Sequence, residues 1–423
     1  MKKCLLFIIL FMTIISNRNI YATPTLDCTS DILIDADSGR ILHGHKENMK
    51  IYPASLTKLL TALTVLDLGE LDDTLIVDEN TPYEIDGSHI ALEPGEELSL
   101  EDMLHGLLIA SGNDVAEVIS KNYSSYEGQF IELMNKKAKD LGALNSNFVN
   151  PHGLHDDDHF TTAYDLSRIA KAAYDNEIIR DIISKTKYTI GVTNKKSEER
   201  HLISTNKLLV GMGYGNQIII NNLWVNMKYE GANGMKTGYT PEAGSCLIGS
   251  AERDGVSLIT VVIDGSTTEV YTDTHELLNY GFENFEKINL INSNEFIKNI
   301  EIESGDSKYL TILSSDSLNA LVNKDSIDEV EETILLNEIS LPVDEGEVIG
   351  TIKYNLNDEL IGEVPLVAAF KVDKIIIEET NLTLFALKTI ILFILSIILL
   401  IIILRLINKY RLYKIRKTKK NRR

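Results

Sequence analysis

Three short motifs in this chain contain residue types suited to nucleophilic chemistry, namely serine hydroxyls with lysine amines near them. The first runs from Ser55 to Lys58 and follows Pro53 at the start of a strongly helical stretch. Because residues three apart lie on one face of a helix, the Lys58 amine should reach the Ser55 hydroxyl. Only a neutral amine can take that proton, so we expect burial and a nearby cation to lower the pKa of Lys58. Taken alone, a serine at a helix start is more often an N-cap than a nucleophile.

The second motif is Ser111-Gly112-Asn113, which lies within an apolar stretch that predicts a helix over residues 100–119. We expect the motif to form a polar turn after residue 110, as the lining of a cleft requires. Ser111 can relay a proton, and the Asn113 amide can hold a substrate carbonyl. A simple helix C-cap at Gly112 is the alternative interpretation.

The third motif is Lys236-Thr237-Gly238, followed by Tyr239, at the end of a glycine-rich approach to a predicted strand. An exposed strand edge lets a peptide lie against it. Lys236 would supply the cation that lowers the pKa of Lys58 and would attract a carboxylate. Thr237 would supply a hydroxyl donor, and Gly238 would keep the strand surface clear.

Hydrophobic periodicity indicates the elements that must position these motifs. Residues 31–43 predict a β-hairpin that turns at 37–39, and residues 244–251 and 256–263 predict two further strands. Helices are predicted at 54–68, 100–119, 130–141, 163–173 and 272–280. Strands first, helices in the middle, and strands with a final helix predict an α+β domain with helices packed on an antiparallel sheet.

The composition changes at about residue 286. Short β-rich runs at 309–313, 334–341, 348–356 and 361–367 are separated by acidic or glycine-containing turns. They predict a small all-β domain over residues 286–375. The sequence of this region contains no nucleophile–base pair and no cluster of metal ligands.

The two ends of the chain predict export and membrane attachment. Residues 1–22 have a positive start, a short apolar run and a small residue at the end, which is typical of a secretory signal peptide. An uncleaved anchor is the alternative. Residues 382–404 are long and apolar enough to span a bilayer, with Lys388 as the only charge. The basic tail, residues 405–423, should lie in the cytoplasm and can contact anionic lipid.

Charge and cysteine content narrow the possible partners. The chain of 423 residues has 41 basic and 62 acidic residues and a net charge of −21. This balance argues against a nucleic-acid partner, and the predicted membrane span already accounts for the basic tail. Only Cys28 and Cys246 remain after removal of the signal peptide, and the sequence leaves open whether they form a disulfide.

The three motifs occur in the order found in penicillin-recognising serine enzymes. Over about residues 25–285 the sequence resembles the D-alanyl-D-alanine carboxypeptidase family of low-molecular-weight penicillin-binding proteins. Residues 287–375 are similar to the C-terminal domain of that family. The resemblance implies a penicillin-binding, β-lactamase-like catalytic domain at 23–285 and a small β domain at 286–375. The apolar segment at 382–404 adds one C-terminal transmembrane helix, and the basic tail predicts that the catalytic domain lies outside the cell.

The resemblance implies a two-step acyl transfer on peptidoglycan stem peptides that end in D-Ala-D-Ala, with β-lactams as inhibitors. Ser55 would attack the carbonyl, Lys58 would take its proton, and Ser111 would help D-alanine to leave before water cleaves the acyl-enzyme. Backbone N–H groups of Ser55 and Tyr239 would form the oxyanion hole. Lys236 and Thr237 would hold the terminal carboxylate. Asn113 and Gly238 would complete the substrate site. Neither a metal nor an organic cofactor is implied.

One segment departs from the family pattern. Relatives often carry an Arg shortly after the last sheet strand, where it helps to hold that carboxylate, whereas residues 264–271 contain no basic residue.

Other interpretations of the function stay open. A class A β-lactamase shares the motifs but normally lacks a membrane span and a second domain; an endopeptidase or transpeptidase would keep the same core. A wall-binding protein without activity would need neither Ser55 nor Lys58. The run from His152 to His159 contains possible metal ligands but is also typical of a polar loop.

Overall fold

The computed structural model describes residues 24–375 and 382–420, so the predicted signal peptide at 1–22 lies outside the described residues. The chain divides into two compact units. Among the described residues, the first contains 24–295 together with Ser314–Leu335 and Thr351–Pro365. The second contains Phe296–Leu313, Leu336–Gly350 and the described residues that follow 365. The three motifs all belong to the first unit.

A five-stranded antiparallel sheet lies at the centre of the first unit, in the order β2-β1-β11-β10-β9. The strands are β1 (Ser30–Asp35), β2 (Ile41–His45), β9 (Ala232–Thr240), β10 (Gly244–Arg253) and β11 (Val256–Gly265). The predicted hairpin at 31–43 and the strands predicted at 244–251 and 256–263 are confirmed. Strand β9, which carries the third motif, lies at an edge of the sheet.

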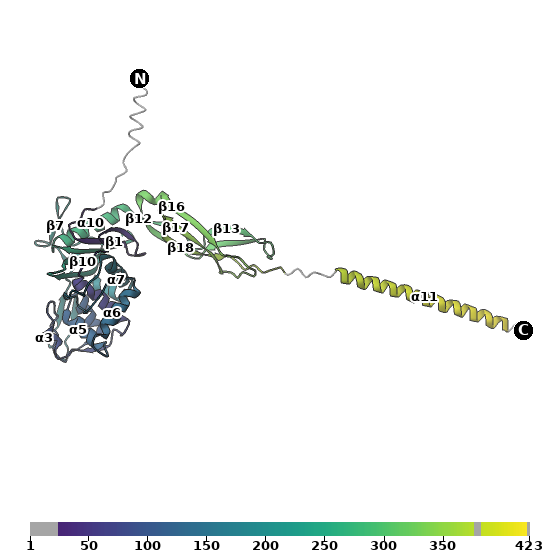
Figure 1. Cartoon of the computed structure of the whole chain (residues 1–423), viewed down its shortest axis with the longest axis horizontal. Helices are drawn as coiled ribbons and strands as arrows, with labels where there is room; N and C mark the ends of the chain where they lie inside the picture. The colour runs from purple at the N-terminus through teal and green to yellow at the C-terminus, as the bar shows by residue number, and fades with distance from the viewer. Residues whose placement is uncertain (1–23, 376–381, 421–423) are drawn as a thin grey trace, which may run out of the picture. The chain divides into compact units, whose positions relative to one another are not determined.

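Side chains alternate between the two faces of this sheet because successive residues of a strand point in opposite directions. In β1, Ile32 and Ile34 belong to the larger hydrophobic core, whereas Leu33 belongs to a second core with Leu277 and Leu278. On the side of the larger core lie the helices α5 (Asn113–Asn122), α6 (Gln129–Asp140) and α7 (Ala163–Asp175), and α10 (Glu269–Asn284) lies on the other side (Figure 1). The unit is therefore built of helices on both faces of an antiparallel sheet.

The helices of the first unit are mostly those that periodicity predicts. They are α2 (Thr57–Leu66), α3 (Thr81–Glu84), α4 (Leu100–Leu108), α5 (Asn113–Asn122), α6 (Gln129–Asp140), α7 (Ala163–Asp175), α8 (Glu177–Ser184), α9 (Lys207–Val210) and α10 (Glu269–Asn284). The single helix predicted at 100–119 is wrong, because the chain breaks between α4 and α5. Ser111 there has a φ of 63°, which a helix does not accommodate.

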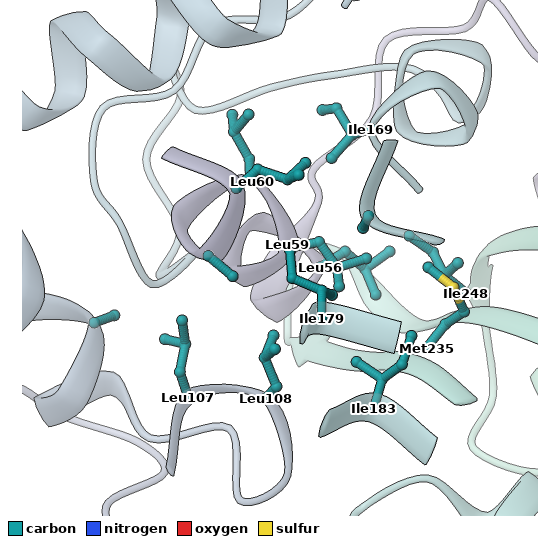
Figure 2. Close-up of a cluster of buried hydrophobic side chains, with 14 of the residues drawn as sticks. Leu56, Leu59, Leu60, Leu107, Leu108, Ile169, Ile179, Ile183, Met235 and Ile248 are labelled. Atoms are coloured by element: carbon teal, nitrogen blue, oxygen red, sulfur yellow. The ribbon is translucent and has the colours of Figure 1, made fainter. Parts of the chain in front are cut away.

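Helix α2 is buried on every side rather than along one stripe. Leu59 and Leu60, with Leu56 from the turn just before the helix, share one hydrophobic cluster with Ile169 of α7 and Ile179 of α8 (Figure 2). Its polar residues are buried too and have partners: Thr61 Oγ1, for example, donates to the carbonyl of Pro151 at 2.6 Å. Packing on all sides fixes the axis of the helix that carries Lys58.

Short two-stranded sheets complete the first unit. They pair β3 (Thr74–Ile76) with β4 (Glu97–Ser99), β5 (Lys187–Ile190) with β6 (Arg200–Ile203), and β7 (Gln217–Ile220) with β8 (Leu223–Asn226). Strand β12 (Phe285–Ile291) pairs with β15 (Leu318–Asn323).

The C-terminal β-rich region is all-β, as predicted. Strands β13 (Phe296–Glu301), β14 (Tyr309–Ser314), β16 (Val330–Leu336), β17 (Val348–Leu356) and β18 (Glu359–Ala368) share a five-stranded sheet. The strand predicted at 334–341 is misplaced, because β16 ends at Leu336 and Pro342, which has no N–H to donate, follows shortly after.

Helix α11 (Leu382–Lys420) is a single helix of 39 residues. Its segment Thr383–Thr418 is long and apolar enough to cross a membrane. The predicted span at 382–404 is therefore helical, and the predicted basic tail continues the same helix as far as residue 420.

Candidate active site

Ser55 lies in a single 3₁₀ turn (Ala54–Leu56) that leads into α2. Lys58 Nζ is 2.9 Å from Ser55 Oγ, so the approach predicted from their spacing is confirmed. The turn is held tightly: Ala54 has a φ of 46°, and a Cβ added to Gly153 would lie 1.8 Å from the Ala54 carbonyl oxygen. Only glycine at position 153 lets the neighbouring loop come this close.

Lys58 is completely buried and has two partners besides Ser55. Its Nζ is 2.6 Å from Asn113 Oδ1 and 2.6 Å from the carbonyl oxygen of His152. Burial lowers the pKa of Lys58 well below its usual range, and the positive charge of Lys236 lowers it further, as expected from the sequence. The carboxylate of Asp114 acts in the opposite direction.

Ser111 and Lys236 form a second pair on the opposite wall of the site. Lys236 Nζ donates to Ser111 Oγ at 2.9 Å and to the Thr237 carbonyl at 2.9 Å. Lys236 is 1% exposed, and this burial lowers its pKa to about 7. The left-handed backbone of Ser111 is what turns its hydroxyl towards β9 instead of leaving it on a helix surface.

Asn113 connects the first motif to the loop between α3 and β4. Its Oδ1 accepts from Lys58, its Nδ2 donates to the Asp86 carbonyl at 2.7 Å, and its N–H donates to the Ser88 carbonyl at 2.6 Å. The amide therefore fixes Lys58 in place; its role towards a substrate carbonyl stays a prediction.

The third motif lies on edge strand β9, directly beside the serine turn. A Cβ added to Gly238 would lie 3.2 Å from the Ser55 nitrogen and 3.2 Å from Ala54 Cβ, so a side chain at this position would crowd the turn. Thr237 Oγ1 lies 2.8 Å from Thr205 Oγ1, and Tyr239 is 66% exposed. The strand placement predicted for the motif is confirmed.

A cavity of about 470 Å³ joins the three motifs. Of the eight residues predicted to form the site, Ser55, Ser111, Asn113, Thr237, Gly238 and Tyr239 line this cavity. Lys58 and Lys236 lie behind the lining, each bonded to a serine hydroxyl in it. The structure thus brings together residues that are far apart in the sequence.

The histidines in the run 152–159 make structural contacts. His152 Nδ1 accepts from the Leu154 N–H at 3.1 Å, and His159 contacts Val149 N and Thr57 Oγ1 through its two ring nitrogens. Burial is the main cause that lowers the pKa of His152 to about 3 and that of His159 to about 4, so both rings are neutral. In the ranges 24–375 and 382–420, no group of three or more His, Cys, Asp or Glu is placed to hold a metal.

Cys28 and Cys246 are buried free thiols, so the possible disulfide does not form. Several further residues near the site were not identified from the sequence: Asp114, Thr205 and Lys207. Asp114 could have been noticed as an acid in the first turn of α5, and the polar Asn206 before an apolar run signals the helix start that places Lys207.

Two family models match consecutive parts of this chain. The model of the D-alanyl-D-alanine carboxypeptidase family matches residues 17–267, and that of the penicillin-binding protein 5 C-terminal domain matches residues 285–374. The D-alanyl-D-alanine carboxypeptidase DacF of Bacillus subtilis is 32% identical over 350 residues, which cover 81% of this chain and 85% of the relative. DacC of Escherichia coli is 28% identical, with 83% and 86% covered.

Among solved structures, penicillin binding protein 5 of Haemophilus influenzae matches with a TM-score of 0.67 and 27% identity, covering 84% of this chain and 99% of that one. The fold and the serine–lysine site define a penicillin-binding serine enzyme. The chain belongs to the D-alanyl-D-alanine carboxypeptidase family of serine peptidases.

Proposed function

We propose that this protein is a serine D-Ala-D-Ala carboxypeptidase that removes the terminal D-alanine from peptidoglycan stem peptides through an acyl-enzyme on Ser55. The observation that carries the proposal is the environment of the Lys58 amine. It is buried, its pKa is lowered, and it lies 2.9 Å from the Ser55 hydroxyl. The family membership supports the same reaction.

The contacts of Lys58 suit a general base. A neutral amine has two N–H donors and one lone pair, and Lys58 has two neighbours that can only accept, Asn113 Oδ1 and the His152 carbonyl. When both N–H groups are donated there, the lone pair is left for the Ser55 O–H. Ser55 can then attack the substrate carbonyl as its proton passes to Lys58.

The opposite wall serves the leaving group. Lys236 donates to Ser111, and Ser111 would pass a proton to the departing D-alanine. The N–H groups of Ser55 and Tyr239 would stabilise the tetrahedral intermediate, and Gly238 leaves the space for this approach. Water then cleaves the acyl-enzyme. These steps use side chains, backbone groups and water, with no metal or organic cofactor.

A β-lactam would enter the same site as a substrate mimic and acylate Ser55. Thr237 would contact the substrate carboxylate, and Lys236, buried behind Ser111, would attract it electrostatically. Asn113 would lie near the substrate carbonyl. The predicted partners are therefore the stem peptide and β-lactams, and no nucleic acid.

We also propose that α11 anchors the enzyme in the cell membrane, with the catalytic part outside and the basic tail inside on anionic lipid. The length and apolar composition of α11 support an anchor. The domain division would be a signal peptide at 1–22, a catalytic domain at 23–285, a β domain at 286–375, a span at 382–404 and a tail at 405–423. Protease added to intact cells should digest the catalytic part and leave only the tail intact. Digestion of the tail would instead indicate the opposite orientation in the membrane.

The reaction is tested with full-length protein in detergent. The protein is incubated with a labelled penicillin and, separately, with diacetyl-Lys-D-Ala-D-Ala, and D-alanine is measured. Ser55→Ala should abolish the label and the release, whereas Ser125→Ala, on an exposed loop, should behave as the natural protein. Absence of both label and release in the natural protein would refute the proposal. Rapid penicillin hydrolysis without release of D-alanine would indicate a β-lactamase instead.

A further inference from the structure

The lining of the catalytic cleft includes a basic residue that the reaction steps above do not use. All residues that line the cavity lie in the described part of the chain, and Lys207 is the only Lys, Arg, Asp or Glu among them. The lining therefore contains no acidic residue that could neutralise its charge. A single positive charge in an otherwise uncharged cleft attracts an anionic part of a ligand.

The backbone at Lys207 is fixed from both sides. Asn206 Oδ1 accepts from the Leu208 N–H at 3.0 Å, and Asn206 Nδ2 donates to the Gly234 carbonyl on β9 at 3.1 Å. The N–H of Lys207 donates to the Tyr271 hydroxyl on α10 at 3.1 Å. Anchored to β9 and α10 in this way, the half-buried Lys207 keeps its place beside the strand that carries Thr237.

Hydroxyl groups in the lining of the cleft supply neutral hydrogen-bond donors in addition to the positive charge of Lys207. Thr205 Oγ1 and Thr237 Oγ1 are 2.8 Å apart, and Ser245 Oγ and Thr267 Oγ1 are 3.3 Å apart; all four residues line the cavity. A cation with several hydroxyl donors is a suitable environment for a carboxylate.

Lys236 is poorly placed to be the main partner of that carboxylate. Its ammonium group is already bonded to Ser111 and to the Thr237 carbonyl, and it is not part of the cavity lining. The segment after β11 contributes Thr267, Val270 and Tyr271 to the cleft, none of which is basic.

We propose that Lys207 determines specificity by binding the C-terminal carboxylate of the peptide substrate, together with the hydroxyls of Thr205 and Thr237. This inference rests on the proposed carboxypeptidase function. Lys207 would be a binding residue and would take no part in proton transfer. It would explain how a chain without an Arg in residues 264–271 still selects a free C-terminus.

The test uses a charge series at this position in the full-length protein in detergent: Lys207→Arg, Lys207→Ala and Lys207→Glu. With diacetyl-Lys-D-Ala-D-Ala, we expect kcat/KM to stay within about threefold for Arg, to fall roughly tenfold or more for Ala, and to fall further for Glu, mainly through KM. Lys228→Ala is the matched control, because Lys228 is exposed and lies outside the cavity lining.

A second measurement separates carboxylate binding from a purely structural role. Benzylpenicillin has a carboxylate, and its methyl ester has none, so the ratio of their acylation rates at Ser55 should fall for Lys207→Ala. An unchanged ratio, or equal losses for the Ala and Glu variants, would overturn the inference. If the natural protein neither takes up the penicillin label nor releases D-alanine, the proposed function fails instead, and that result is distinct.

Discussion

At the scale of single residues, the two buried lysines of the site have different surroundings. Lys58 lies against two carbonyl-type oxygens and a serine hydroxyl, whereas Lys236 bonds to Ser111 and to one carbonyl. The charge of Lys236 lowers the pKa of Lys58, and Asp114 raises it. Two nearby groups thus act with opposite sign on the base.

Replacing Lys236 should move the pH dependence of acylation. The base must be neutral, so the rate falls as the pH drops through the pKa of Lys58. Lys236→Met removes a positive charge, the pKa of Lys58 rises, and the acidic limb should move to higher pH. Penicillin acylation of Ser55 measured from pH 5 to pH 9 checks the shift, although the maximal rate should also fall by more than about tenfold. A limb that stays in place would contradict the assigned coupling.

Asp114→Asn should have the opposite effect. The substitution removes a negative charge that raises the pKa of Lys58, so the acidic limb should move to lower pH. Asn retains one oxygen to accept from the Ile90 and Leu92 N–H groups, which Asp114 now holds at 3.2 and 3.3 Å. The same acylation profile is measured, and a shift in the same direction as for Lys236→Met would be inconsistent with this electrostatic account.

At the scale of elements, the serine turn depends on a loop that comes extremely close to it. Gly153→Ala should destabilise the protein by about 3 kcal/mol or more, because its Cβ would collide with the Ala54 carbonyl oxygen. Gly128→Ala is a matched control: both glycines have a φ of 85°, but nothing lies within 4 Å of a Cβ at position 128. The control should lose only about 1–2 kcal/mol. Denaturant unfolding compares the two, and equal losses would show that backbone strain alone matters.

Strand β6 is tied to the turn before β4 by a buried ion pair. Arg200 Nη2 is 2.6 Å from Glu96 Oε1 and 2.7 Å from Oε2, and Glu96 is completely buried. Arg200→Met should cost about 3–5 kcal/mol, because it leaves a buried carboxylate without its cation. Lys136→Met, which breaks an exposed pair with Asp140, should leave the free energy of unfolding almost unchanged. Thermal and denaturant unfolding measure both losses, and similar values would contradict the assigned role of burial.

The sequence allows the main elements and all eight proposed site residues to be named, because short motifs and hydrophobic periodicity are local signals. It does not reveal contacts that depend on distant segments. Lys58 donates to the backbone carbonyl of His152, and a backbone contact of this kind leaves no recognisable pattern of side chains in the sequence. The break between α4 and α5 depends on the left-handed backbone of Ser111, and the apolar pattern runs on through it. Lys207 reaches the cleft only because Asn206 and Tyr271 hold α9 beside β9.

At the scale of the whole molecule, α11 is the one helix in the described part of the chain that is long and apolar enough to cross a membrane. Ending the chain after residue 375 should release the protein from the membrane fraction. The kcat/KM for diacetyl-Lys-D-Ala-D-Ala should change less than about twofold, since the catalytic residues all precede residue 240. Cell fractionation and assays of the released enzyme check both outcomes. Retention in the membrane would indicate a second attachment.

The buried lysine of β9 also has a consequence for folding. In the unfolded chain Lys236 keeps its proton up to about pH 10.5, but in the folded protein its pKa is about 7. Between these values folding expels a proton, so the stability contributed at this position falls as the pH drops from 10.5 towards 7, by up to about 1.4 kcal/mol per pH unit. The free energy of unfolding of the natural protein should therefore rise more steeply with pH than that of Lys236→Met. Parallel slopes in denaturant unfolding at pH 7.5 and 9.5 would argue against this linkage. An alkaline medium would favour the intact fold because the site holds a poorly solvated amine.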